Sequence, residues 1–151
     1  MMEFIVLNRE QIKTFCTNKK HIVISIMDPG DSGGPADIPA NRKRMSVLRL
    51  AFHDWNEKQK DLIKKSHSVS EQDFVFFDEK MAGQIVEFVR GALKIGRLEL
   101  IVCQCEAGIS RSAGVAAGLA KCINGDDAYF FKHFLPNSLV YSLIVKEWNR
   151  I

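Results

Sequence analysis

The stretch that decides the fold reads Cys105-Glu106-Ala107-Gly108-Ile109-Ser110-Arg111-Ser112. An apolar, strand-like run, Leu98–Gln104, leads into it, and small residues that favour a helix, Ser112–Ile123, lead out of it. A loop between the end of a strand and the start of a helix directs its backbone N–H groups into one hollow, at the positive end of the helix dipole. We therefore predict an anion-binding loop that suits a phosphate dianion.

The residue types in this loop also predict its chemistry. Cys105 is the candidate nucleophile, because helix N-termini and nearby cations lower the pKa of a cysteine from about 8.5 to roughly 3.5–7.5. Arg111 offers a planar fork that clamps two phosphate oxygens, and Ser112 can offer its hydroxyl to the thiolate. The candidate phosphate-binding residues, mainly through their amides, are Glu106, Ala107, Gly108, Ile109, Ser110 and Arg111.

Two segments carry a resemblance to a known family. The loop resembles the Cys-x5-Arg-Ser/Thr signature of the cysteine-dependent protein tyrosine phosphatases, most closely the dual-specificity-like branch. The tail Asn137–Leu143 is similar to the last helix of that branch, which an asparagine begins. The resemblance implies a phosphoric monoester hydrolase that acts through a cysteinyl-phosphate intermediate on a phosphorylated protein or a small phosphate ester.

The resemblance also implies an aspartate that donates a proton to the leaving group, from a loop after an upstream strand. Asp54 follows the predicted strand Met45–Phe52 and is the best match. An alternative interpretation is that Asp54 is the N-cap of a helix over residues 56–65. Weaker candidates for the acid are Asp28, Asp31, Asp73 and Asp78, and His53 is a candidate for either a structural or a proton-transfer role.

Gln104 departs from the family pattern, which usually has a histidine just before the nucleophile. A glutamine forms hydrogen bonds but carries no charge, so a second hypothesis is a catalytically weak or inactive phosphate-binding pseudophosphatase. A third is a sulfur-transfer or arsenate-reducing enzyme, which also uses a thiolate in an anion loop. Glu106 would repel an anion if it pointed inward, so we expect it to have a partner outside the loop.

Strands and helices alternate along the chain, which predicts an α/β fold: a central, mostly parallel sheet of about four or five strands with helices on both faces. The signature loop lies between a strand and a helix, and residues 1–151 form a single domain. The expected strands are Glu3–Leu7, Lys20–Met27, Met45–Phe52 and Leu98–Gln104. The expected helices are Arg9–Cys16, Glu57–Lys65, Glu79–Lys94, Ser112–Ile123, Asp126–Phe134 and Asn137–Trp148.

The composition of the chain limits the kinds of partner and cofactor that we expect. A net charge of +3 in 151 residues gives no reason to expect nucleic acid. No apolar stretch approaches the roughly 18 residues of a membrane span. The four cysteines show no paired metal spacing and suit a reducing, cytoplasmic setting. We expect no metal or other cofactor, because Arg111 and the amides supply the positive field for a phosphate or sulfate bound in the loop.

Overall fold

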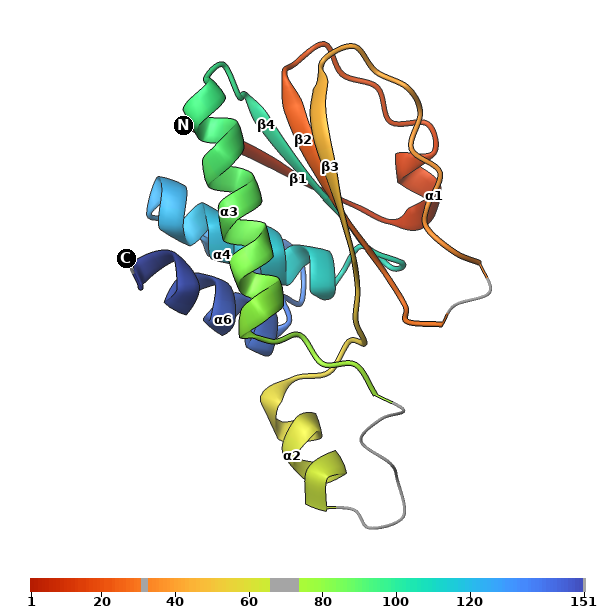
Figure 1. The fold of residues 1–151 in the computed structure, drawn as a ribbon, viewed down its shortest axis with the longest axis vertical. Helices are drawn as coiled ribbons and strands as arrows, with labels where there is room; N and C mark the ends of the chain where they lie inside the picture. Colours follow the sequence, from red (N-terminus) through yellow and green to blue (C-terminus); the bar gives the residue numbers. More distant parts are fainter. Residues whose placement is uncertain (31–32, 66–73, 151) are drawn as a thin grey trace.

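A computed structural model of the chain describes residues 1–30, 33–65 and 74–150, and shows a four-stranded sheet in the order β1-β4-β2-β3 (Figure 1). The strands are β1 (Glu3–Leu7), β2 (His21–Met27), β3 (Arg44–Ala51) and β4 (Leu100–Gln104). All neighbouring strands pair in parallel, and the central strand β4 is buried along its whole length. The predicted α/β fold with a parallel sheet is confirmed.

The helices are α1 (Arg9–Ile12), α2 (Glu57–Lys65), α3 (Glu79–Ile95), α4 (Arg111–Asn124), α5 (Ala128–His133) and α6 (Ser138–Asn149). Side-chain caps mark helix starts: for example, Asp78 accepts a hydrogen bond from the backbone of Met81 at α3, and Asn137 accepts one from Val140 at α6. Among the described residues, no helix combines the length and the apolar character that crossing a bilayer requires.

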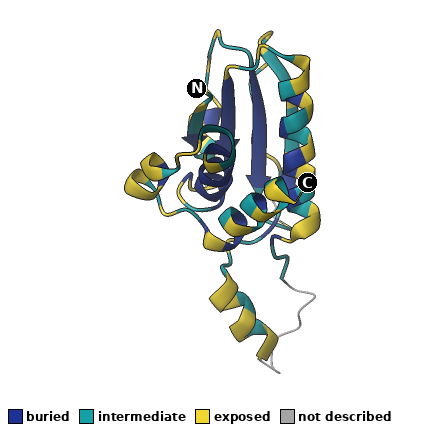
Figure 2. Ribbon diagram, turned by 90° about the vertical axis from the view of Figure 1, so that its left-hand side faces the viewer, coloured by how far each residue is buried: buried dark blue, intermediate teal, exposed yellow. Residues whose placement is uncertain are grey.

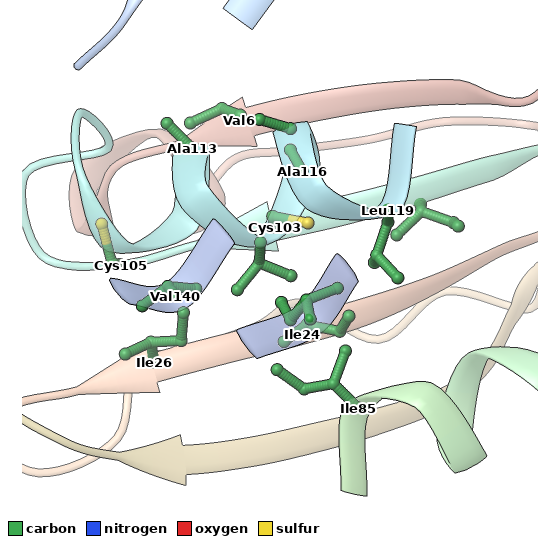
Figure 3. Packing of buried hydrophobic residues seen from close by; sticks show 14 of the residues in the cluster. Val6, Ile24, Ile26, Ile85, Cys103, Cys105, Ala113, Ala116, Leu119 and Val140 are labelled. Carbon is green, nitrogen blue, oxygen red and sulfur yellow. The ribbon is translucent and has the colours of Figure 1, made fainter. Parts of the chain in front are cut away.

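The main hydrophobic core lies between one face of the sheet and α3, α4 and α6. Ile24 and Cys103 of the sheet meet Ile85 of α3, Leu119 of α4 and Val140 of α6, and all five side chains are fully buried (Figure 3). Figure 2 shows the strands coloured mostly as buried and α3 with both buried and exposed residues. In contrast, α2 has no buried residue and projects from the body of the fold.

The two faces of the sheet are covered unequally. The second face of the sheet is covered by a smaller cluster in which Ile12 of the short α1 packs with loop residues, among them Phe15 and Ala36. The helix expected over Arg9–Cys16 ends at Ile12 instead. The amides of Thr14 and Phe15 bond to carbonyls three residues back, which tightens the chain and turns the Phe15 side chain toward the sheet.

Close packing of α4 on α6 brings the start of α6 next to the signature loop. At Gly114 in α4, a Cβ atom would lie 2.9 Å from the backbone oxygen of Asn137. Only glycine permits this approach without displacing backbone. The small residues that predicted a helix here therefore also bring Asn137 close to the loop.

Candidate active site

The signature loop spans residues 105–110, between the end of β4 and the start of α4. Neighbouring segments hold its carbonyl groups: those of Glu106, Ile109 and Ser110 accept hydrogen bonds from the amides of Arg9 (3.2 Å), Leu135 (3.1 Å) and Asn137 (3.0 Å). Within the described part of the chain, the amides of residues 106–111 have no hydrogen-bond acceptor. Six N–H donors at a helix start are thus left for an anion.

Gly108 gives the loop its closed shape. Its φ of +65° lies in the left-handed region, which side-chain-bearing residues rarely adopt. A Cβ atom at this position would also lie 2.7 Å from the backbone nitrogen of Asn8, just after β1. Both the backbone angle and the contact with β1 therefore require glycine.

Cys105 lines a cavity of about 340 Å³ and is almost completely buried. Its Sγ is 3.0 Å from Oγ of Ser112, a distance at which the hydroxyl can donate to a thiolate. The residues that line the cavity are Asp54, Cys105, Ala107, Ile109, Ser110, Arg111 and Leu135. Cys103 stands two residues earlier in the core, where burial and the nearby Cys105 raise its pKa far above the usual range.

Arg111 enters the same cavity from the first turn of α4, with its side chain 7% exposed. Its NH1 nitrogen donates to Oδ1 of Asp28 at 2.6 Å and to the carbonyl oxygen of Phe52 at 2.8 Å. NH1 carries two hydrogens, so these bonds occupy both of them, and Nε and NH2 supply the remaining donors. Asp28, a weaker candidate for the acid, is in this structure the partner that orients the arginine.

Asp54 stands after β3 and lines the cavity that contains Cys105 and Arg111. Its Oδ1 accepts hydrogen bonds from Oγ of Ser110 (2.7 Å) and Nδ2 of Asn137 (2.8 Å). In the described part of the structure Oδ2 has no partner, so one carboxylate oxygen is anchored and the other is open to carry a proton.

The alternative role of Asp54 as a helix cap is wrong. Helix α2 begins at Glu57, and Asn56 supplies the capping contacts. Oδ1 of Asn56 accepts from the amide of Gln59 at 2.9 Å, and Oε1 of Gln59 accepts from the amide of Asn56 at 3.0 Å. The Asp54 side chain bonds to the signature loop and the start of α6 instead.

The remaining candidates for proton transfer have other positions. Asp78 caps α3, with Oδ1 2.9 Å from the amide of Met81. Nδ1 of His53 accepts a hydrogen bond from the amide of Val75 at 3.0 Å, which ties the end of β3 to the segment before α3. Asp31 and Asp73 lie outside the described residues.

Gln104, the departure from the family pattern, has a structural role beneath the nucleophile. Its side chain is 1% exposed; Oε1 accepts from Oγ of Ser25 at 2.5 Å, and Nε2 donates to the carbonyl oxygen of Cys105 at 3.0 Å. These two bonds join β2 to the backbone of the nucleophile. Gln104 therefore positions Cys105 without adding charge.

Glu106 has the external partner that its charge requires. Its Oε2 lies 3.3 Å from NH1 of Arg9, and the Glu106 side chain does not line the cavity. Arg9 also donates to the carbonyl oxygens of Gly34 (2.9 Å) and Gly33 (2.7 Å). One arginine thus joins the signature loop to the segment that follows β2.

Asn137 is a site residue whose role sequence reasoning missed. Besides capping α6, its Nδ2 donates to Oδ1 of Asp54 and, at 3.1 Å, to the carbonyl oxygen of Trp55. The asparagine is recognisable from sequence as the start of a helix. Its contact with Asp54 spans 83 residues, and no local pattern predicts that contact.

The described residues contain no group of three or more His, Cys, Asp or Glu side chains placed to hold a metal ion. A thiol, an arginine and a carboxylate line one cavity.

Comparisons with known proteins place this site in a known fold. No family model and no curated protein match the sequence. The human tyrosine phosphatase-like serine/threonine/tyrosine-interacting protein is similar in structure, with a TM-score of 0.58 and 16% identity over 93% of this chain and 87% of that one. PTPMT1 (TM-score 0.50, 13% identity) covers 98% of this chain and 90% of its own. OH1 from the Orf virus, a tyrosine phosphatase with triple substrate specificity, has a TM-score of 0.50 and 13% identity over 100% of this chain and 85% of its own.

These likenesses define the class of fold: the chain has the phosphatase-like α/β fold of the tyrosine and dual-specificity phosphatase-like proteins. The expected resemblance to the dual-specificity-like branch is confirmed at the level of the fold. The signature loop lies where the resemblance predicts it, between β4 and α4.

Proposed function

We propose that the protein is a cysteine-dependent phosphoric monoester hydrolase of the protein tyrosine or dual-specificity phosphatase type. The observation that carries the proposal is that Cys105, Arg111 and Asp54 line one cavity above six unbonded loop amides. The fold supports it, since OH1 from the Orf virus is a tyrosine phosphatase. A phosphorylated protein or a small phosphate ester is the substrate, with the phosphate in the loop and no cofactor.

In the first step, the Cys105 thiolate attacks phosphorus and forms an S–P bond while the ester P–O bond breaks. The amides of residues 106–111 and the Nε and NH2 groups of Arg111 hold the phosphoryl oxygens in place. The electron pair of the broken bond goes to the leaving oxygen, which takes a proton from Asp54.

In the second step, the Asp54 carboxylate takes a proton from a water molecule whose oxygen attacks phosphorus. The S–P bond breaks, the electron pair of that bond returns to sulfur, and inorganic phosphate leaves. Ser112 stabilises the departing thiolate through the 3.0 Å contact with Cys105. Asp54 ends the cycle protonated, ready for the next substrate. A thiol nucleophile needs a reducing compartment, so we propose a cytoplasmic location.

A second candidate is a catalytically weak or inactive phosphate-binding protein, which the neutral Gln104 favours. Gln104 fixes the backbone of Cys105 by hydrogen bonds alone and supplies no positive charge to the thiolate. Such a protein would bind phosphate esters in the loop and turn them over slowly or not at all.

Phosphate release from a panel of phosphopeptides, nucleotides and inositol phosphates tests the proposal, with tungstate binding measured in parallel. Cys105→Ser should lose several decades of turnover. The same variant should still bind tungstate, because the amides and Arg111 remain. Tungstate binding by the wild-type protein without turnover of any ester would favour the second candidate. Turnover by Cys105→Ser above about a hundredth of the wild-type rate would contradict the role of Cys105 as the nucleophile.

A further inference from the structure

A second hollow opens beside the Cys105 cavity. It measures about 280 Å³ and is lined by Asp54, Asn56, Gln59, Ser110, Leu135, Pro136, Asn137 and Ser138. Asp54, Ser110 and Leu135 line both hollows. The two spaces are therefore neighbours that share one wall.

The shared wall relates the position of the second hollow to that of the leaving group. A proton donor must lie within hydrogen-bond reach of the leaving oxygen, about 2.6–3.2 Å. With the phosphoryl group in the loop, the ester oxygen faces Asp54, and the atoms beyond it extend along the wall that contains Asp54. The second hollow lies along this wall and is placed to receive the leaving group.

Apart from Leu135 and Pro136, the residues that line this hollow are polar, and Asp54 is the charged residue among them. The oxygens of Asn56 and Gln59 are used in the capping contacts at α2, which leaves the NH2 groups of both side chains without a partner in the described structure. Neither a lysine nor an arginine lines it.

A carboxylate outside the lining connects the two sides of the hollow. Glu57 accepts hydrogen bonds from Ser138 (3.0 Å) and Ser142 (3.1 Å), which joins the start of α2 to α6. These bonds hold the two sides of the hollow in place relative to each other. A second phosphate in this space would find no lining cation to balance its charge.

We propose that the second hollow is a leaving-group subsite for phosphate monoesters whose leaving group is uncharged and rich in hydrogen-bond acceptors. The amide NH2 groups of Asn56 and Gln59 bind those acceptors. The lack of a lining cation disfavours any ester with another phosphate beside the scissile one, because a charge taken out of water without a partner costs free energy. The inference rests on the proposed function, because Asp54 as the acid sets the direction of the leaving group.

Binding to the Cys105→Ser protein tests this inference even if turnover is absent. The probes are a phosphotyrosine peptide with a serine on each side, the same peptide with both serines phosphorylated, and a charge-matched peptide with its extra phosphates five residues away. We expect calorimetry at low ionic strength to give about fivefold weaker binding for the adjacent phosphates than for the distant ones.

Three variants in the Cys105→Ser background locate the effect. Gln59→Met and Gln59→Lys lose the same amide, and only the lysine adds charge, so Gln59→Lys should bind the adjacent-phosphate peptide about two- to fivefold more tightly than Gln59→Met does. Gln84→Lys, on the exposed side of α3, adds the same charge elsewhere and should not favour that peptide.

Two results together would overturn the subsite. The Cys105→Ser protein would bind the adjacent-phosphate peptide as tightly as the distant-phosphate peptide or more tightly, and Gln59→Lys would bind the adjacent-phosphate peptide no more tightly than Gln59→Met. Failure of the proposed function has a different signature. In that case the protein with Cys105 intact releases no phosphate from any of these peptides, while the discrimination between them in binding persists.

Discussion

The carboxylate of Asp28 lies 2.6 Å from NH1 of Arg111, and it sets which edge of the guanidinium is free for substrate. Because the Phe52 carbonyl takes the other NH1 hydrogen, only the Nε and NH2 edge remains for two phosphate oxygens. The ion pair joins the end of β2 to the start of α4 across the cavity. The site therefore contains two aspartates in different positions: Asp28 contacts the arginine, and Asp54 is the residue that we propose as the proton donor to the leaving group.

This ion pair predicts the effect of changing Asp28. Asp28→Ala leaves a nearly buried guanidinium without its charged partner. The lost hydrogen bond is worth about 1.5–3 kcal/mol, and without it Arg111 is held less well against the transition state, so kcat/KM should fall roughly tenfold to a hundredfold. Asp28→Asn keeps an acceptor oxygen and should recover part of the loss. The measurement is kcat and KM on an aryl phosphate, with tungstate affinity alongside. Tighter tungstate binding by Asp28→Ala would show that Asp28 competes with the anion.

The role of Asp54 predicts a dependence on the leaving group. Asp54→Asn should lose about two to four decades in rate on an alkyl or phenyl phosphate, whose leaving oxygen needs a proton. The loss should be much smaller on an activated aryl phosphate, and the basic limb of the pH–rate profile should flatten. Equal losses on both substrates with an unchanged basic limb would assign Asp54 a structural role.

The contact between Asn137 and Asp54 predicts a milder form of the same behaviour. Asn137→Ser removes the bond to Oδ1 of Asp54 and keeps a side-chain oxygen that can cap α6. We expect slower turnover of alkyl phosphates, with activated aryl phosphates less affected. The free energy of unfolding should fall by less than about 1–2 kcal/mol. Loss of activity on both substrates in equal measure would mean that Asn137 acts only through the fold.

The backbone of the loop predicts a large effect from one methyl group. Gly108→Ala places a Cβ at a φ of +65° and 2.7 Å from the Asn8 nitrogen, so the free energy of unfolding should fall by about 2–4 kcal/mol. Gly91 in α3 is the matched control: nothing lies within 4 Å of an added Cβ, and Gly91→Ala should stabilise by about 0.4–1 kcal/mol. Denaturant unfolding measures both. Equal effects of the two substitutions would contradict the structural role of Gly108.

Thiol labelling provides a test that does not depend on turnover. Burial raises the pKa of Cys103 and Cys122, and the charge of Cys105 raises that of Cys103 further, so both hold less thiolate than an ordinary cysteine at any pH below their pKa. At pH 6.5 iodoacetate should modify Cys105 first, and phosphate should protect it. The exposed Cys16 is the reference for an ordinary thiol. Labelling of Cys16 ahead of Cys105 would show that the loop does not activate its thiol.

Much of the fold was predictable because its strands are short, apolar and separated by polar segments. The site was predictable where the signal is local: Cys105, Arg111 and Ser112 lie within eight residues. Asp54 was predictable only through the family resemblance, which implies an aspartate in a loop after an upstream strand.

The features of the fold and site that could not be predicted depend on contacts between segments that are distant in the sequence. Asp28 and Arg111 are 83 residues apart, and so are Asp54 and Asn137, so neither pair leaves a spacing pattern in the sequence. The early end of α1 likewise follows from the packing of Phe15 against the sheet, which overrides the local helix preference.

The most direct test of the central claim is to trap the phosphorylated enzyme. A radiolabelled aryl phosphate mixed with the protein and quenched in acid within milliseconds should leave label on the protein, and mass spectrometry should locate the phosphate on Cys105. Cys105→Ser should carry no label, and Asp54→Asn should accumulate more of it than the wild type when the leaving group is activated. Release of phosphate with no labelled protein at any time, or label that persists in Cys105→Ser, would contradict the cysteinyl-phosphate mechanism.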